Sequence, residues 1–473
     1  MLFNSFAFVQ FFVIVTTLLF ALPHRFRWAL LLAGSCVFYM FFVPVYILIL
    51  AVTIVIDYLA GIWIEDSADP HRKKIFLQIS IFSVCAVLFA FKYFNFFNSN
   101  VAAVAAALHW HYPIKALRIA LPIGLSFHTF QSLSYVIEVY RGKQKAERHF
   151  GIYALYVMYF PQLVAGPIER PQNLLHQFHE QKNFDLARLQ DGLSLALWGL
   201  FKKVVIADSL ALYADTIYNS STHHNGATLL VATYCFAFQI YCDFSAYSDI
   251  ARGVSRVYGI ELMKNFDAPY FSTSISEFWS RWHISLSTWF KDYVYFPLGG
   301  NRVPLLRNFL NLFLVFLLSG FWHGANWTFI VWGALHGAYL IAGRLLALAR
   351  RRFGWTGPQD GGPFRKMIAM AITFHLVLIA WVFFRADHLS TALDVVRRMM
   401  VPTGRIFWDP ILVQCAVGIV MVTAGDWFIR RTNYWDNLGR FPVAFRFAYS
   451  LSLLCGIALL GIEKGSQFIY FQF

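Results

Sequence analysis

The histidine at position 323 is the residue of this chain best suited to chemistry. It ends an apolar run that is long enough to enter a membrane, within residues 318–327, LSGFWHGANW. An ionisable imidazole at bilayer depth costs free energy unless it is buried in protein, and such residues usually have a function. Gly320 and Gly324 remove side chains on both sides of the ring, so another chain segment or a substrate could approach it closely.

A second candidate, His283, lies in a polar interruption that is unusually rich in aromatic residues. Residues 265–302 read NFDAPYFSTSISEFWSRWHISLSTWFKDYVYFPLGGNR. Ser274 or Ser276 could cap a helix there, and on that helix Trp279 and His283 would share one face. The segment as a whole is typical of an amphipathic helix at the membrane interface, with cations that reach toward the head groups. We single out His283 as its candidate for chemistry.

A third histidine, His336, follows in the phrase WGALHG. On one continuous helix His323 and His336 would stand about 20 Å apart, too far to share a substrate atom. A helix break at residues 324–326 would change this, and Gly and Asn are typical of such a segment end. His336 is therefore either a structural histidine or, with Trp322 and Asn326, a supporting member of the site.

Two carboxylates, Asp243 and Asp249, follow an apolar run directly. A carboxylate that enters a membrane segment needs a cation or several hydrogen-bond donors. Three arginines in this part of the sequence could serve as partners, although the sequence does not show which of them does: Arg252, Arg256 and Arg281. The carboxylates either form structural ion pairs or orient a catalytic histidine, and both readings stay open.

Several other chemistries lack the residues that they need. The chain has no G-x-S-x-G, P-loop or H-E-x-x-H motif, so serine hydrolase, ATPase and zinc peptidase activities lose their support. The six cysteines form no C-x-x-C pair and are typical of small core residues. His176, His179 and the pair at 223–224 have no thiolate or carboxylate partners at useful spacing, so we expect no metal site.

The composition is that of a membrane protein. Of 473 residues, 58% are hydrophobic and 14% charged, and the mean hydropathy is +0.54. Apolar runs near 20 residues recur, so we expect an all-α polytopic protein with roughly ten to twelve transmembrane segments. We expect one membrane domain over residues 1–473, with a motif-bearing core of about 118–345. The net charge of +14 is spread over short loops; lipid head groups explain it better than nucleic acid does.

The basic residues also predict an orientation. The first apolar segment has no Lys or Arg before it, and Arg25 and Arg27 follow it. This differs from the layout of a cleaved signal peptide. The positive-inside rule then places the N-terminus outside the cell membrane and the turn with Arg25 and Arg27 in the cytoplasm. Basic clusters at 71–74 and 141–148 fall on the same, cytoplasmic side.

Several separated phrases, in order, resemble the membrane-bound O-acyltransferase family, and most closely its bacterial subgroup that acetylates alginate and other exported polysaccharides. The phrases are LPIGLSF (121–127), FPQLVAGPI (160–168), the segment 243–249, EFWSRWH (277–283), GFWHG (320–324) and WVFFRAD (381–387).

The resemblance implies a site and substrates. His323 matches the essential histidine of the family and His283 its second polar position, in a ring of helices around a central tunnel. It also implies acetyl-CoA or another acyl thioester as the donor substrate, with no permanently bound cofactor. The acceptor would be an exported polysaccharide, a periplasmic acetyltransferase partner, or both.

A mechanism follows as a hypothesis. His323 would take the proton from an acceptor hydroxyl as that hydroxyl attacks the thioester carbonyl. His283 would hold or polarise the donor, or donate to the developing oxyanion. An acyl intermediate on His323 is the alternative. A transporter of acyl groups, lipid or polymer is the competing function, but the unusual polar groups are clustered between Asp243 and His336, which favours an enzyme.

Overall fold

The protein is built from helices. The computed structural model describes residues 1–118, 121–354, 362–462 and 467–469. Every regular element in these ranges is helical, which confirms the expected all-α class. Eight helical segments there are long and apolar enough to cross a membrane, so the chain is a multi-pass membrane protein. They are Pro44–Asp66, Pro70–Ala107, Gly226–Val257, Leu305–His323, Trp327–Arg352, Pro363–Arg385, Ile411–Thr432 and Val443–Leu460.

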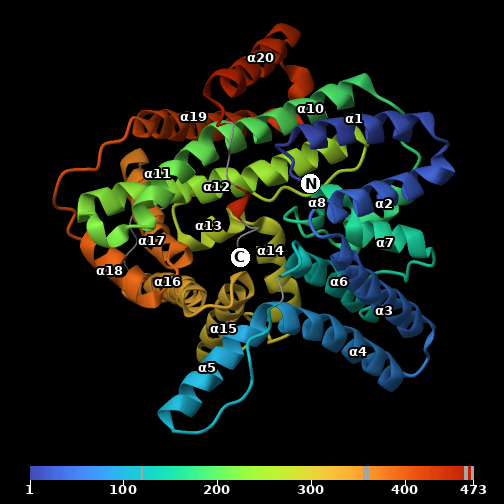
Figure 1. Ribbon diagram of the computed structural model, residues 1–473, viewed down its shortest axis with the longest axis horizontal. Helices are drawn as coiled ribbons and strands as arrows, with labels where there is room; N and C mark the ends of the chain where they lie inside the picture. The colour runs from blue at the N-terminus through green and yellow to red at the C-terminus, as the bar shows by residue number, and fades with distance from the viewer. Residues whose placement is uncertain (119–120, 355–361, 463–466, 470–473) are drawn as a thin grey trace. The chain divides into compact units, whose positions relative to one another are not determined.

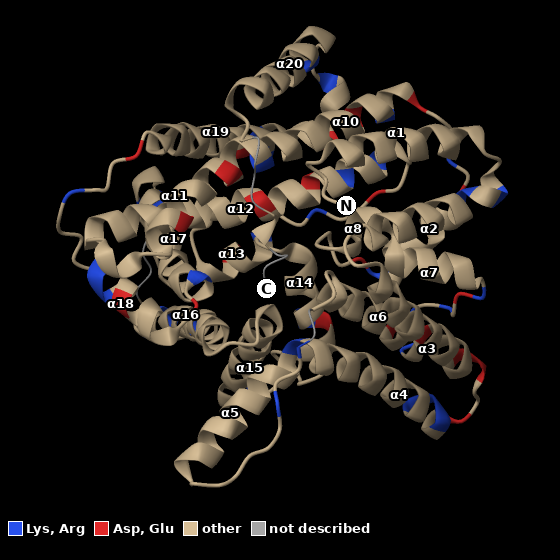
Figure 2. Cartoon of the chain, in the orientation of Figure 1, with Lys and Arg blue, Asp and Glu red and all other residues tan. Residues whose placement is uncertain are grey.

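Charged residues lie mostly outside the long apolar helices. Lys, Arg, Asp and Glu lie mainly at the ends of helices and in loops, while the long helices carry few of them (Figure 2). The shorter apolar helix α1 (Phe6–Ala21) is followed by the basic residues of the next helix, α2 (His24–Met40). This is the distribution that membrane insertion requires, because a charge at the bilayer centre is costly.

The chain divides into two compact units, residues 1–196 with 247–263 and residues 197–246 with 264–473. Figure 1 labels the helices along the chain. Two helices, α10 (Leu186–Phe201) and α12 (Gly226–Val257), contribute residues to both. Besides α1 and α2, the first unit holds α3 (Ile47–Asp66), α4 (Pro70–Leu88), α5 (Phe94–Ala107), α6 (Leu125–Tyr140), α7 (Phe150–Met158), α8 (Phe160–Leu163) and α9 (Pro171–His179). The second holds α11 (Asp208–Tyr218), α13 (Ile275–Arg281), α14 (Ile284–Phe290), α15 (Leu305–His323), α16 (Trp327–Arg352), α17 (Pro363–Arg385), α18 (Leu389–Met399), α19 (Ile411–Thr432) and α20 (Val443–Leu460).

Helices α15 and α16 form a tight hairpin that carries His323. The helix break expected at residues 324–326 is confirmed: α15 ends at His323, and Asn326 caps α16 by accepting a hydrogen bond from the backbone N–H of Thr328 at 3.1 Å. The Asn326 amide also donates to the carbonyl of Asp387 at 2.9 Å, which fixes the turn. The hairpin therefore holds His323 at a helix end.

The glycines beside His323 let the two helices approach each other. A Cβ on Gly320 would stand 2.3 Å from the carbonyl oxygen of Phe329, and one on Gly324 would stand 2.1 Å from the ring of the same residue. A Cβ on Gly333 of α16 would stand 2.2 Å from the carbonyl oxygen of Phe316. The space freed by these glycines is thus filled by the neighbouring helix, and no substrate is needed to explain them.

Substitution of Gly333 by alanine is expected to destabilise the hairpin. The new Cβ would overlap backbone, which cannot rotate away, so we expect a loss of about 1–3 kcal/mol in the free energy of unfolding. Gly343→Ala is the matched control on the same helix, because a Cβ there meets nothing within 4 Å. Thermal unfolding of both variants in detergent measures the difference. Equal melting temperatures would contradict the close approach.

The expected continuous helix around His283 is wrong. Ser274 caps α13, accepting from the backbone N–H of Glu277 at 3.1 Å, but α13 ends at Arg281 and a separate helix, α14, begins at Ile284. His283 lies between them with φ 44° and ψ 53°, in the left-handed region. Trp279 and His283 therefore do not share a helix face. The left-handed turn instead presents the imidazole from the start of α14.

Candidate active site

His323 is buried within a shell of aromatic rings. It is 5% exposed, and its ring centroid lies 4.9 Å from that of Trp322 and 5.4 Å from that of Phe384. Trp332 of α16 stands almost perpendicular to it, at 5.0 Å and 85°. The second helix of the hairpin, the preceding residue and α17 together enclose the imidazole, so its surroundings are largely free of bulk water.

His283 is held by one amide oxygen. Its Nδ1 lies 3.2 Å from Oδ1 of Asn265, which also accepts from the backbone N–H of Ser285 at 3.2 Å and from the Ser285 hydroxyl at 2.9 Å. A backbone N–H can only donate, so the shared Asn265 atom is an oxygen, and Nδ1 of His283 must carry the proton. Burial lowers the pKa of His283 to about 3, so the ring is neutral at physiological pH. Its Nε2 therefore presents a lone pair.

The two histidines predicted from sequence lie side by side. The ring centroids of His283 and His323 are 6.4 Å apart. Trp322 is also 6.4 Å from His283, and Phe244 of α12 packs against the other side of His283 at 4.6 Å. Residues 40 positions apart thus meet in one unit of the fold. Two buried imidazoles at this spacing could act on one substrate.

His336 belongs to the same cluster through Trp332. The Trp332 ring lies between the two histidines, 5.0 Å from His323 and 4.9 Å from His336. The indole N–H of Trp279 donates to Nδ1 of His336 at 3.2 Å. Because of the helix break, a single ring, that of Trp332, contacts both His323 and His336. His336 is therefore a neighbour of the site.

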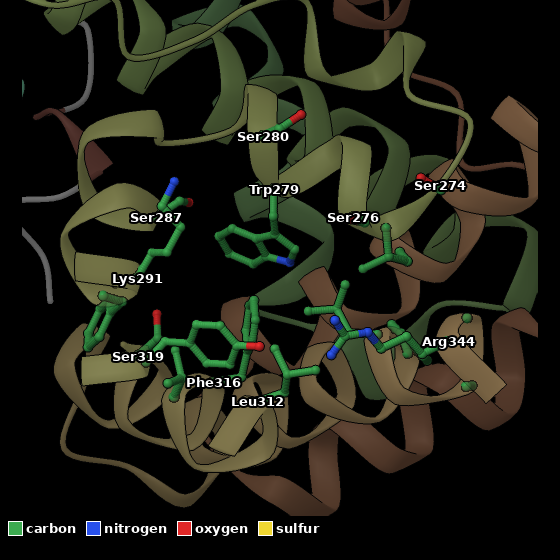
Figure 3. Close-up of a pocket in the computed structure, with 18 of the residues that line it drawn as sticks. Ser274, Ser276, Trp279, Ser280, Ser287, Lys291, Leu312, Phe316, Ser319 and Arg344 are labelled. Atoms are coloured by element: carbon green, nitrogen blue, oxygen red, sulfur yellow. The ribbon is translucent and has the colours of Figure 1, made fainter. Parts of the chain in front are cut away.

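A cavity of about 890 Å³ lies next to this cluster (Figure 3). Its walls come from α13 to α17 and are mainly apolar, with the Trp279 indole at the centre of the view and Phe316 of α15 facing it. Ser319, one helical turn before His323, also lines it. Lys291 and Arg344 contribute cationic side chains. An apolar cavity with a few polar groups is the usual form of a small-molecule site.

The cavity wall that adjoins the histidine cluster is aromatic. Neither His283 nor His323 lines the cavity, but Trp279 lines it and bonds His336. The Trp279 ring also lies 5.7 Å from that of Trp332. The cavity therefore adjoins the histidine cluster at Trp279, whose indole contacts both His336 and Trp332.

The partner of Asp243 is a lysine and not an arginine. Nζ of Lys203 lies 2.6 Å from Oδ1 of Asp243 and 2.9 Å from Oδ1 of Asp208. All three side chains are at most 4% exposed. The backbone N–H of Ile469 donates to the other oxygen of Asp243 at 2.6 Å. The structural ion pair is thus observed, and the next residue, Phe244, packs on His283.

The remaining predicted residues have structural contacts. Asp249 belongs to the first unit, where Arg252 lies 3.9 Å from it, as one of the anticipated pairings. Arg281 donates to Glu277 within α13. Sequence reasoning missed three residues. Asn265 gave no signal, Trp332 was one tryptophan among fifteen, and Lys203, a cation in an apolar run, could have been noticed by the rule that applied to Asp243.

Comparisons with known proteins identify the family of this chain. Residues 148–384 match the model of the membrane-bound O-acyltransferase family. The chain is 37% identical to the peptidoglycan O-acetyltransferase of Helicobacter pylori, over 78% of this chain and 73% of that protein. It is 40% identical to a probable alginate O-acetylase of Azotobacter vinelandii, over 78% and 72%. It is 27% identical to the teichoic acid D-alanyltransferase of Bacillus subtilis, over 55% and 68%.

The family model spans His283, His323 and His336, the three histidines that the fold brings into one cluster. The relatives named as O-acetyltransferases extend the match over most of the chain. A transporter that leaves bonds intact is therefore no longer a competing reading. The chain belongs to the membrane-bound O-acyltransferase family and is an O-acyltransferase.

Proposed function

We propose that this enzyme transfers an acetyl group from acetyl-CoA to a hydroxyl of an exported envelope polysaccharide, or to a periplasmic acetyltransferase partner that passes it on. The observation that carries the proposal is the pair of buried imidazoles, His283 and His323, 6.4 Å apart beside a large apolar cavity. The named activities of the relatives, on peptidoglycan and alginate, support a polysaccharide as the final acceptor.

In this proposal His323 is the general base. It removes the proton from the acceptor hydroxyl while the oxygen attacks the thioester carbonyl, and the C–S bond then breaks. The proton passes to the leaving thiolate, so free CoA and an acetyl ester are the products. A thioester is already activated, which makes direct transfer sufficient without an acyl-histidine.

Of the two roles expected for His283, this proposal keeps the first, which is to hold the donor. Because its Nδ1 proton is engaged by Asn265, the lone pair on Nε2 can accept a hydrogen bond but cannot supply one to an oxyanion. We assign it to holding the donor, by accepting from an N–H close to the thioester. Donation to the oxyanion then needs another group.

The cavity is the proposed route of the donor. Its apolar walls suit the thioester arm, and Lys291 and Arg344 suit the phosphates of CoA. Arg350, Arg351 and Arg352 end α16, the helix that carries Arg344, which supports a cytoplasmic entrance. The chain would then lie in a bacterial inner membrane with its N-terminus on the periplasmic side.

Radiolabelled acetyl-CoA tests the proposal. The protein, purified and returned to lipid vesicles, is incubated with labelled donor and envelope glycan from cells that lack it, with and without periplasmic extract. Label is expected in alkali-labile O-acetyl esters of the glycan or of an extract protein, with one free CoA released per acetyl transferred. Label in neither, although the protein is folded, would refute the substrates. CoA release without transfer when extract is present would refute the acceptor.

A further inference from the structure

The indole nitrogen of Trp332 is a donor without an acceptor. Trp332 is fully buried, and its Nε1 has no hydrogen-bond partner among the described residues. An indole N–H can only donate, and leaving such a group unpaired in the interior costs free energy. The ring stands 5.0 Å from that of His323. A buried donor beside the proposed base is therefore available to an oxygen that is not part of the protein.

The neighbouring ring carries a second donor of this kind. Nδ1 of His336 accepts from the Trp279 indole, so the ring proton of His336 is on Nε2. That Nε2 is also without a partner in the described part of the chain, and His336 is fully buried. The rings of Trp332 and His336 lie 4.9 Å apart. Two unpaired N–H groups thus occur on adjacent rings.

We propose that Trp332 is a further catalytic residue, whose indole N–H binds the carbonyl oxygen of the acyl donor and stabilises the oxyanion that forms on it. His336 assists as a second donor, and Trp279 is a positioning residue that fixes its tautomer. The inference rests on the proposed function, because it assumes acyl transfer from a thioester at His323. It assigns the donor role that the tautomer of His283 leaves open.

The acceptor hydroxyl gives its proton to His323, and its oxygen forms a bond to the carbonyl carbon. The carbonyl π electrons move to oxygen, where Trp332 and His336 donate hydrogen bonds. Those electrons return as the C–S bond breaks, and the thiolate takes the proton from His323. Donors fixed in advance in a water-poor site stabilise such a charge without reorganisation.

A matched pair of tryptophan variants tests the assignment. Trp332→Phe keeps an aromatic ring and deletes the unpaired N–H. Trp381→Phe removes the same atoms from a tryptophan stacked on it, 6.0 Å away, whose N–H already donates to the Tyr270 hydroxyl at 3.2 Å. With acetyl-CoA as donor and release of free CoA as readout, Trp332→Phe is expected to lower kcat about 10²-fold with little change in KM. Trp381→Phe should stay within about threefold of wild type.

The outcomes separate this inference from the proposed function. If Trp332→Phe retains wild-type kcat while His323→Gln is inactive, the oxyanion assignment is wrong and the function stands. If the wild-type protein does not consume acetyl-CoA, the proposed function itself fails. Equal losses in both tryptophan variants would mean a packing effect and would overturn the assignment. Should Trp332→Phe fail to accumulate, His336→Phe must lower kcat at unchanged KM, or the inference is rejected.

Discussion

Replacement of His323 by glutamine is expected to reduce turnover of acetyl-CoA by at least about 10³-fold. Glutamine has a similar size and can form hydrogen bonds, but it cannot take a proton, and general base catalysis contributes roughly 10²–10⁴-fold. The helix end, the tight hairpin and the surrounding rings should hold the substituted side chain in place. Release of free CoA by the purified variant, at protein levels matched to wild type, measures the loss.

A second membrane histidine supplies the control. His375 of α17 has both ring nitrogens bonded, to the Tyr234 hydroxyl at 2.6 Å and to the Ala371 carbonyl at 2.7 Å. His375→Gln should therefore keep more than about a third of the activity, since these groups act outside the proposed reaction. If His323→Gln kept turnover near that of His375→Gln, a base at His323 would be excluded. Mass spectrometry of the acid-quenched wild type would reveal an acyl-His323, whose detection would replace direct transfer by a two-step route.

His323 could be predicted because the feature that marks it, an ionisable side chain at the end of an apolar run, is visible in the local sequence. An imidazole that ends an apolar run is visible in the sequence, and so is the Gly and Asn signal for the break that follows it. The structure confirms both and adds the reason for the glycines, which is the approach of Phe329 and Gly333. The start of α13 could also be predicted, since Ser274, one of the two serines expected to cap it, is its N-cap.

The surroundings of His283 were not predictable, because a long-range contact overrides the local pattern. Helical spacing favoured one continuous helix that carries both Trp279 and His283. Asn265 instead binds His283 and Ser285, and its backbone carbonyl accepts from Ile284 at 2.9 Å. These bonds offset the cost of a left-handed residue. No spacing rule shows that an asparagine 18 positions earlier will break a helix, or which nitrogen of the imidazole will carry the proton.

The partner of Asp243, Lys203, could not be predicted for a related reason. Arginines close in sequence were the candidates, but the ion pair joins Asp243 to Lys203, 40 positions away. Lys203 lies in a π-helical segment, Lys202–Ala207, which inserts a residue into the turn and directs two successive lysines into the interior. The sequence shows that a buried aspartate needs a cation nearby. Which cation it pairs with depends on how helices α11 and α12 pack together.

Substitution of Lys203 by methionine is expected to be the most destabilising single change in the second unit. Methionine fills a similar volume but removes the cation that bonds both Asp208 and Asp243, and loss of one partner of a buried pair costs about 3–5 kcal/mol. We expect a large fall in the free energy of unfolding, measured by titration with a denaturing detergent. Activity should also fall, because Phe244, next to Asp243, supports His283.

The same substitution at an exposed pair isolates the effect of burial. Lys264 pairs with Asp267 at 2.5 Å, where the side chains are 44% and 31% exposed. Lys264→Met should change the free energy of unfolding by less than about 1 kcal/mol, since water and salt screen such a pair. A double variant, Lys203→Met with Asp243→Asn, should recover part of the loss by removing one uncompensated charge. If Lys203→Met were as stable as Lys264→Met, the buried ion pairs of Lys203 with Asp208 and Asp243 would not contribute to stability as proposed.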